Sequence, residues 1–354
     1  MFTFLHAADL HLDSPLRGLE RYQGAPVDEI RGATRRALEN LVASALERAV
    51  DFVLIAGDLY DGDWKDYNTG LFFVAQMARL RAADIPVIAI CGNHDAANKM
   101  TRSLRLPDNV ELLSHRRAQT ARTAKLKELG VAVHGRSFAK AAELDNLVLA
   151  YPAKQAGMFN IGLLHTSLTG VEGHERYAPA TVDDLRLSGY DYWALGHVHQ
   201  RRTMCEDPPI LFPGNLQGRH IREPGAKGCL RVHVDDRGHA EIDFQPLDVF
   251  RWEVCAVDAR DLDRPDEVLE RLSVDLSQLV QRSDGLPMAV RVTVSGCCQA
   301  HDRLMSEQEQ WINQVRGLAL DVGGGNLWVE KVRLRTTPQR ALDPTLLALS
   351  LIHI

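Results

Sequence analysis

The 354-residue sequence has no long apolar run. Its apolar stretches are short, such as the run from Asp51 to Ala56, and none approaches the roughly 20 residues that a membrane-spanning helix requires. The chain opens on the strand-like run from Phe2 to Leu5, without the basic start and apolar core of a secretion signal. We therefore expect a cytoplasmic protein without a membrane partner.

Cysteine is also scarce, and its spacing is typical of neither a disulfide framework nor a metal site. The sequence contains six cysteines and no CxxC pair. Adjacent Cys297 and Cys298 would form a strained bridge with each other. We therefore expect buried, reduced thiols, in keeping with the cytoplasmic prediction.

The sequence lacks an excess of positive charge. Its formal net charge is −6, whereas nucleic-acid-binding proteins usually carry a basic excess. Net charge hides local patches, however, and Lys331, Arg333 and Arg335 form one of several small basic groupings. A solvated surface is the default interpretation of such a grouping.

What the sequence does contain is a regular alternation of strands and helices over its first 100 residues. Apolar runs at Phe2–Ala8, Phe52–Ala56 and Ile85–Ile90 predict strands, and residues Arg31–Ala49 and Thr69–Ala83 have the apolar spacing of helices. Strands separated by helices predict a parallel, buried sheet. In such sheets, functional residues gather just past the carboxyl ends of the strands.

The pattern then continues less regularly. Further strands are predicted at Leu147–Ala150, Asn160–Leu164, Tyr192–Leu195, Ile210–Phe212, Cys229–Val234 and Ala240–Phe244. The last two are joined by Asp236-Arg237-Gly238, which predicts a hairpin turn.

A second, smaller domain is predicted beyond Leu247. It has a β-α-β-α-β pattern, in which Ser306 and Glu309 have the spacing of a helix capping box. Its elements are expected at Phe250–Val257, Asp266–Gln281, Met288–Ser295, Ser306–Leu320 and Asn326–Leu334. Asp343-Pro344 is then a typical helix start, so we expect residues 338–354 to begin a helical segment that is truncated.

Five polar clusters follow predicted strands. They contain carboxylate, imidazole and amide groups, and each of them alone would be a weak signal. The clusters are Asp9-x-His11, Gly57-Asp58, Gly92-Asn93-His94-Asp95, His165 and Gly196-His197-Val198-His199. Chance agreement of all five in this order is very improbable.

Phosphodiester hydrolysis explains these residue types. Two divalent metal ions about 3.5–4 Å apart can supply the nucleophile, neutralise charge and stabilise the leaving group. A bridging ligand needs two oxygens to share, as Asp58 has, and Asn93 offers a neutral carbonyl oxygen that limits the negative charge of the site. Without a nearby cysteine, this nitrogen and oxygen set suits Mn, Fe or Zn. We expect two divalent ions, Mn²⁺ before Fe or Zn.

These five motifs resemble the signature of the calcineurin-like metallophosphoesterases. The resemblance implies an α/β fold in which a β-sandwich is flanked by helices, in four αββα layers, with a second, smaller α+β capping domain. It divides the chain into a catalytic domain at 1–247, a capping domain at 248–337 and the start of the helical segment at 338–354.

The resemblance also implies a role for each motif residue. Asp9, His11 and His199 would hold one metal, and Asp58 would bridge to the other. Asn93, His165 and His197 would hold the second metal. His94 would bind no metal and would protonate the leaving oxygen or stabilise the charge of the transition state. Asp95 would orient His94.

The opening from Phe4 to Pro15 and the Pro213-Gly214-Asn215 turn narrow the resemblance to the YhaO-type branch of the SbcD-like DNA-repair exonucleases. This branch implies DNA as substrate, a homodimer, and an SbcC/YhaN-like coiled-coil ATPase as partner. One departure is Asp61, which stands where some of these nucleases carry a histidine, three residues after the bridging aspartate.

Alternatives remain open at the level of the sequence. His134 also follows an apolar run, although His165 is favoured because its strand is nearer in order to that of the Gly196-His197-Val198-His199 motif. Arg219 and Arg222 could reach a phosphate or lie on an ordinary surface. Two alternatives to the DNA exonuclease function also remain. One is a small-molecule phosphodiesterase or phosphatase with the same site, and the other is a non-catalytic subunit of an ATPase complex.

Overall fold

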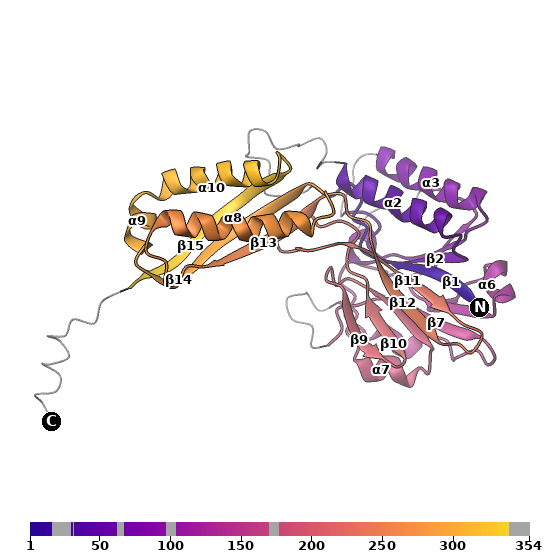
Figure 1. The fold of residues 1–354 in the computed structure, drawn as a ribbon. Coiled ribbons are helices and arrows are strands. Elements are labelled where there is room, and N and C mark those ends of the chain that lie inside the picture. The colour runs from indigo at the N-terminus through magenta and orange to yellow at the C-terminus, as the bar shows by residue number, and fades with distance from the viewer. Residues whose placement is uncertain (16–29, 31, 62–66, 97–103, 170–176, 340–354) are drawn as a thin grey trace, which may run out of the picture. The chain divides into compact units, whose positions relative to one another are not determined.

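The computed structural model describes residues 1–15, 30, 32–61, 67–96, 104–169 and 177–339. These residues divide after Val249 into two compact units (Figure 1). Most of the predicted C-terminal helical segment falls on residues 340–354, which lie outside the described residues. Within the described residues, no helix has the length and apolar character needed to cross a membrane.

The first unit contains two six-stranded sheets. The first sheet has the order β12-β11-β1-β2-β3-β4, and its strands β1 to β4 are parallel, as predicted for the first three. These four strands are β1 (Phe2–Ala7), β2 (Phe52–Ala56), β3 (Val87–Ile90) and β4 (Val110–Leu112). The predicted hairpin of β11 (Gly228–Val234) and β12 (Ala240–Pro246) is present and joins β1 in antiparallel pairing.

The second sheet has the order β5-β6-β7-β8-β10-β9. Its inner strands β6, β7, β8 and β10 are parallel, and the edge strands β5 and β9 pair antiparallel. The strands are β5 (Gln119–Thr120), β6 (Val131–Gly135), β7 (Phe159–His165), β8 (Tyr192–Gly196), β9 (Arg202–Glu206) and β10 (Pro209–Phe212).

Burial explains the layered arrangement of this unit. One apolar cluster joins the facing sides of the two sheets, for example Phe52 with Ile161 and Tyr192. A second cluster lies between the first sheet and helices α2 (Ala33–Glu47) and α3 (Tyr67–Ala82). On the outer side of the second sheet, Trp193 packs in a third cluster with Leu185 of α7 (Val182–Leu187). The expected four-layer sandwich of two sheets flanked by helices is confirmed.

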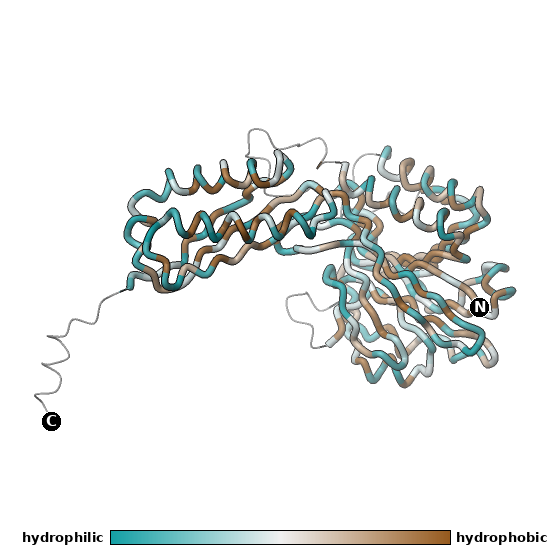
Figure 2. The backbone as a smooth tube through the Cα atoms, in the orientation of Figure 1, coloured by the Kyte–Doolittle hydropathy of each residue, from teal (hydrophilic) through white to brown (hydrophobic). Residues whose placement is uncertain are grey.

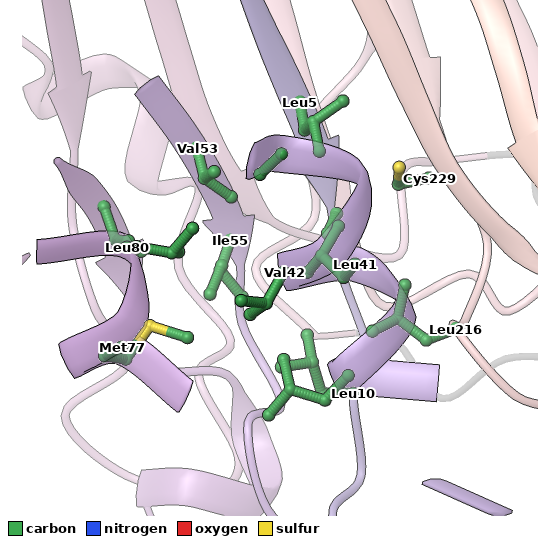
Figure 3. Close-up of a cluster of buried hydrophobic side chains, with 14 of the residues drawn as sticks. Leu5, Leu10, Leu41, Val42, Val53, Ile55, Met77, Leu80, Leu216 and Cys229 are labelled. Carbon is green, nitrogen blue, oxygen red and sulfur yellow. The ribbon is translucent and has the colours of Figure 1, made fainter. Parts of the chain in front are cut away.

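Helix α2 shows how the sequence specifies this packing. Its buried residues recur at helical spacing, and Leu41 and Val42 lie in one apolar cluster with Val53 and Ile55 of β2 (Figure 3). Short helices fill the connections of the unit: α4 (Asn93–Ala96), α6 (Ala124–Glu128) and the 3₁₀ helix η1 (Leu147–Ala150).

Two local predictions were wrong. Residues Leu147–Ala150 form the 3₁₀ helix η1 rather than a strand, because the Asn146 side chain accepts a hydrogen bond from Val148 N and turns the chain. Ser306 ends helix α9 (His301–Ser306) instead of capping the next helix. Its hydroxyl donates to Arg303 O, and α10 (Gln308–Val322) begins two residues later.

The second unit is a parallel three-stranded sheet, β13-β14-β15, with helices on one face (Figure 1). The strands are β13 (Arg251–Asp258), β14 (Met288–Cys298) and β15 (Leu327–Pro338), and the longest helix is α8 (Pro265–Gln281). Helices α8 and α10 alternate hydrophilic and hydrophobic residues (Figure 2). Their buried side chains, such as Leu272 and Val315, pack on the sheet.

All six cysteines are free thiols. Cys229, Cys255 and Cys298 are buried, as expected. Cys91 and Cys205 are only partly buried, and the expectation was wrong for Cys297, which is exposed near the end of β14.

Leu41 provides a test of the first unit's core. Its side chain is 1% exposed, so Leu41→Ala leaves a cavity and should lower the free energy of unfolding by about 2–5 kcal/mol. Leu187→Ala is the matched control, because that leucine is 85% exposed and should change the value by less than about 0.5 kcal/mol. Urea unfolding measures both, and equal effects would contradict the packing described for α2.

Candidate metal centre

The predicted site residues lie where parallel strands end. Asp9 and His11 follow β1, Asp58 follows β2, and Asn93 begins α4 three residues after β3. From the second sheet, His165 is the last residue of β7. His197 and His199 follow β8. The sandwich thus brings residues such as His11 and His199, which are 188 positions apart in the chain, into one cluster.

Among the residues that the structure describes, three overlapping groups of donor atoms could each hold a metal ion. Within each group the ligand atoms lie within 4.8 Å of one another. The groups are Asp9 with His11 and His199, Asp9 with Asp58 and His165, and His11 with Asp58 and His94.

Asp58 lies between the two halves of the cluster. Its Oδ2 atom is 3.7 Å from His11 Nε2 and 3.5 Å from His165 Nε2. On one side, His11 Nε2 is 3.1 Å from His199 Nε2. On the other, His165 Nε2 is 3.0 Å from the side-chain oxygen of Asn93. A carboxylate in this position can share its oxygens between two neighbouring cations.

His197 adjoins the second half of the cluster. Its ring centroid is 5.1 Å from that of His165, and its backbone N–H donates to both carboxylate oxygens of Asp9 at 3.1 and 3.0 Å. His134, the alternative to His165, lies elsewhere: its ring nitrogens contact Thr120 at 2.9 Å and Asn160 at 3.0 Å. The tertiary structure therefore brings His165, and not His134, to the cluster.

Several of these residues have an unusual backbone. Asp9, His11, Asp58 and His197 have φ angles of 52°, 43°, 50° and 99°, in the left-handed region that non-glycine residues seldom adopt. Such conformations cost free energy and persist only where the surroundings enforce them. Here the main chain is held by hydrogen bonds of 3.0 Å, from Asp9 N to Gly57 O and from His11 N to Asp58 O.

Two motif glycines permit the close packing of the site. A Cβ atom at Gly92 would lie 2.3 Å from Asp58 Oδ1 and 2.7 Å from the His165 ring. At Gly196 it would lie 1.9 Å from the carbonyl oxygen of Ala56. Only glycine fits at either position without displacing a neighbour, which is why glycines precede the ligands in these motifs.

Burial sets the protonation of the cluster. It lowers the pKa of both His11 and His165 to about 3, so both imidazoles are neutral at pH 7, the form that binds metal ions. Burial and the charge of Asp58 raise the pKa of Asp9 well above its usual value. Two buried carboxylates side by side are unfavourable unless a cation accompanies them. The mixture of carboxylate, amide and imidazole donors therefore fits divalent ions such as Mn²⁺, Fe²⁺ or Zn²⁺.

The expected role of Asp95 needs correction. Its carboxylate accepts hydrogen bonds from the backbone N–H groups of Leu59, Tyr60 and Gly92 at 3.0–3.1 Å, and so ties the β2 and β3 loops together. The carboxylate that faces His94 belongs to Asp61, whose Oδ1 is 3.3 Å from His94 Nδ1. The reason is geometric: consecutive residues of a helix such as α4 point in different directions.

Residues beyond the motifs complete the site. Glu223 Oε1 lies 2.7 Å from His199 Nδ1, and the Asn215 amide donates to Glu223 Oε2 at 2.9 Å. Burial raises the pKa of Glu223, but the hydrogen bond from His199 and the charge of Arg219 outweigh it, so the net pKa is low and Glu223 is ionised. Asn215 was visible in the sequence as part of the Pro-Gly-Asn turn. No motif pointed to Glu223.

Comparisons with known proteins agree with this geometry. The calcineurin-like phosphoesterase family matches residues 2–201, and the middle domain of the metallophosphoesterase YhaO matches residues 252–337. Over 295 residues the chain is 36% identical to the uncharacterized metallophosphoesterase YhaO of Bacillus subtilis (strain 168), covering 83% of this chain and 72% of that protein.

More distant relatives are DNA double-strand break repair proteins named Mre11. The protein of Methanopyrus kandleri is 25% identical over 268 residues, which cover 68% of this chain and 55% of that protein. The protein of Sulfurisphaera tokodaii is 28% identical over 238 residues, which cover 63% of this chain and 58% of that protein. The site, the sandwich and these matches agree: the chain belongs to the calcineurin-like phosphoesterases, a family of metal-dependent hydrolases, and to their YhaO-type branch.

Proposed function

We propose that the protein is a DNA exonuclease that hydrolyses phosphodiester bonds with two divalent metal ions, of which Mn²⁺ is the first candidate. The observation that carries the proposal is the convergence of Asp9, Asp58 and the histidines at the ends of parallel strands. Bound ions would supply Lewis-acid stabilisation of the phosphoryl charge and a nucleophile at neutral pH.

In this proposal, the protein residues have separate roles. Asp58 is the shared ligand, since its Oδ2 lies within 3.7 Å of both His11 and His165. The first ion would be held by Asp9, His11 and His199, and the second by Asn93, His165 and His197. Because the imidazoles of His11 and His165 are already neutral, they bind a cation without first losing a proton.

His94 is the proposed catalytic acid. Its side chain is 35% exposed, whereas those of His11 and Asp58 are only 1% and 2% exposed, and its backbone N–H donates to Asp58 Oδ1 at 3.0 Å. Asp61 contacts its Nδ1 and thereby orients the ring, which leaves Nε2 to donate a proton to the leaving oxygen.

Two observations support DNA as the substrate. The Mre11 relatives are DNA double-strand break repair proteins by name. Independently, Lys331, Arg333 and Arg335 alternate along β15 and therefore share one face of that strand. No acidic group among the described residues forms an ion pair with them, and hydroxyl-bearing Thr293 and Ser295 are the neighbours of the two arginines on β14. Basic and hydroxyl side chains are the usual phosphate contacts in DNA complexes.

The proposal extends to assembly. On the resemblance to the YhaO-type branch, we propose a homodimer and an SbcC/YhaN-like coiled-coil ATPase as partner. The chain spans just over half of the length of these Mre11 relatives.

Asp58→Ala tests the nuclease directly. The wild-type protein with Mn²⁺ should shorten end-labelled linear DNA progressively, whereas the variant should lose bound metal and activity together. Metal content is measured by mass spectrometry, with Asp145→Ala, an exposed aspartate of the same unit, as the control that keeps both. Asp58-dependent hydrolysis of bis-p-nitrophenyl phosphate without any DNA degradation would favour the small-molecule phosphodiesterase instead. A wild-type chain that binds no metal after loading would favour a non-catalytic subunit.

His94→Ala separates catalysis from metal binding. The variant should keep its metal content and lose about 10²–10⁴-fold in kcat, the usual contribution of a general acid. The test measures steady-state kinetics on bis-p-nitrophenyl phosphate and the metal content of the same sample. Loss of metal from the variant would mean that His94 is a ligand, as its proximity to His11 and Asp58 permits.

The basic row on β15 is tested by salt dependence. Replacing Lys331, Arg333 and Arg335 by alanine should weaken DNA binding and reduce the slope of log K against log salt concentration by about 3, one unit for each lost phosphate contact. Arg260 and Arg264 are matched control positions in the same unit, since both are already paired with acidic side chains. An unchanged slope in fluorescence anisotropy would remove this surface from the DNA-binding proposal.

A further inference from the structure

The loop between β10 and β11 reaches the metal centre although it carries none of the five motifs. We propose that Arg219, in this loop, is a positioning residue that couples His199 to His94 through Glu223 and Asp61. The inference rests on the proposed function, because it concerns the ligands and the acid of the same site.

Arg219 contacts two carboxylates from different segments. Its Nη2 lies 3.1 Å from Glu223 Oε1 and also 3.1 Å from His199 Nδ1. Its Nη1 lies 3.4 Å from Asp61 Oδ1, across 158 positions of sequence. Its backbone N–H also donates to Glu223 Oε2 at 2.8 Å. The side chain is only 14% exposed, so little solvent screens these contacts.

Glu223 transmits the position of Arg219 to the metal ligands. The Glu223 carboxylate is 6% exposed, and both of its oxygens are engaged: Oε1 by His199 and Arg219, and Oε2 by Asn215 and the Arg219 backbone. A carboxylate that accepts the Nδ1 proton of His199 leaves Nε2 free for a metal ion and fixes the ring plane. His199 Nε2 is the atom that lies 3.1 Å from His11 Nε2.

Asp61 transmits the position of Arg219 to the proposed acid. Asp61 Oδ1 is 3.3 Å from His94 Nδ1 and 3.5 Å from His11 Nδ1. The Arg219 guanidinium therefore contacts both the Glu223 carboxylate, which contacts the proposed metal ligand His199, and the Asp61 carboxylate, which contacts the proposed acid His94. Without it, two partly buried negative groups would lose their shared cation, and each would be free to turn away from its histidine.

The geometry favours positioning over direct contact with a substrate phosphate. Both terminal nitrogens of Arg219 already face carboxylates, and its Nε atom is buried without a hydrogen-bond partner in the described part of the chain. A guanidinium can bridge two acceptors with its planar fork, whereas the point charge of a lysine holds them less well. Lysine should therefore substitute only in part.

The test compares Arg219→Met with Arg222→Met, an exposed arginine of the same loop. Mn²⁺ is titrated into each metal-free protein by calorimetry, and kcat and KM are measured on bis-p-nitrophenyl phosphate. Arg219→Met should weaken Mn²⁺ binding and lower kcat, each by about 10–100-fold, the usual effect of losing a group that orients a ligand. KM should stay within about twofold, Arg219→Lys should recover part of both losses, and Arg222→Met should match the wild type.

Two results would overturn the inference. A raised KM with unchanged kcat and Mn²⁺ affinity would make Arg219 a substrate contact, and behaviour equal to Arg222→Met would make its ion pairs inconsequential. If Arg219→Met does not fold, Arg219→Lys and Asp61→Asn are compared alone and combined. Non-additive losses of kcat support the coupling, and additive losses refute it. Inactivity of the wild type would refute the proposed function, while the Mn²⁺ titrations would still decide the role of Arg219.

Discussion

The structure around the site depends on one electrostatic constraint: Asp9 and Asp58 are buried side by side. Both side chains are at most 2% exposed, and the charge of Asp58 contributes to the raised pKa of Asp9. Such a pair is unfavourable in a protein interior unless cations neutralise it. The neutral imidazoles, the amide of Asn93 and the left-handed backbone at Asp9 and Asp58 all make sense as the surroundings of bound divalent ions.

Rigidity comes from the sandwich, and orientation comes from its loops. The ligands stand at the ends of parallel strands whose side chains are buried on both faces, so their backbone positions are determined by core packing. The ring orientations depend on a second set of groups: Asp61 behind His94, Glu223 behind His199, and Arg219 between the two carboxylates. Catalytic sites generally need both, since small changes in geometry are costly to the rate.

Local sequence patterns predicted secondary structure correctly where the burial of apolar side chains was the dominant preference. Predominantly apolar runs became β1, β2 and β3, and the apolar spacing of residues 31–49 became α2, because burial of these side chains admits few alternatives. Local patterns failed where a single hydrogen bond decided the outcome, as at Asn146 for η1 and at Ser306 for the end of α9. Asp95 was misjudged for a related reason, since adjacency in sequence does not put two helical side chains on one side.

The sequence by itself indicated the candidate ligands, their order and the strands that carry them, because each motif combines a strand end with the residue types that metal-dependent hydrolysis requires. It also indicated a second unit after residue 247. Only the tertiary structure decided which groups face those ligands. Asp61, Arg219 and Glu223 belong to no common motif, and Asp61 meets Arg219 from 158 positions away. Contacts between residues so far apart in the chain arise when two sheets pack together, and the local sequence patterns of motifs and apolar spacing do not predict them.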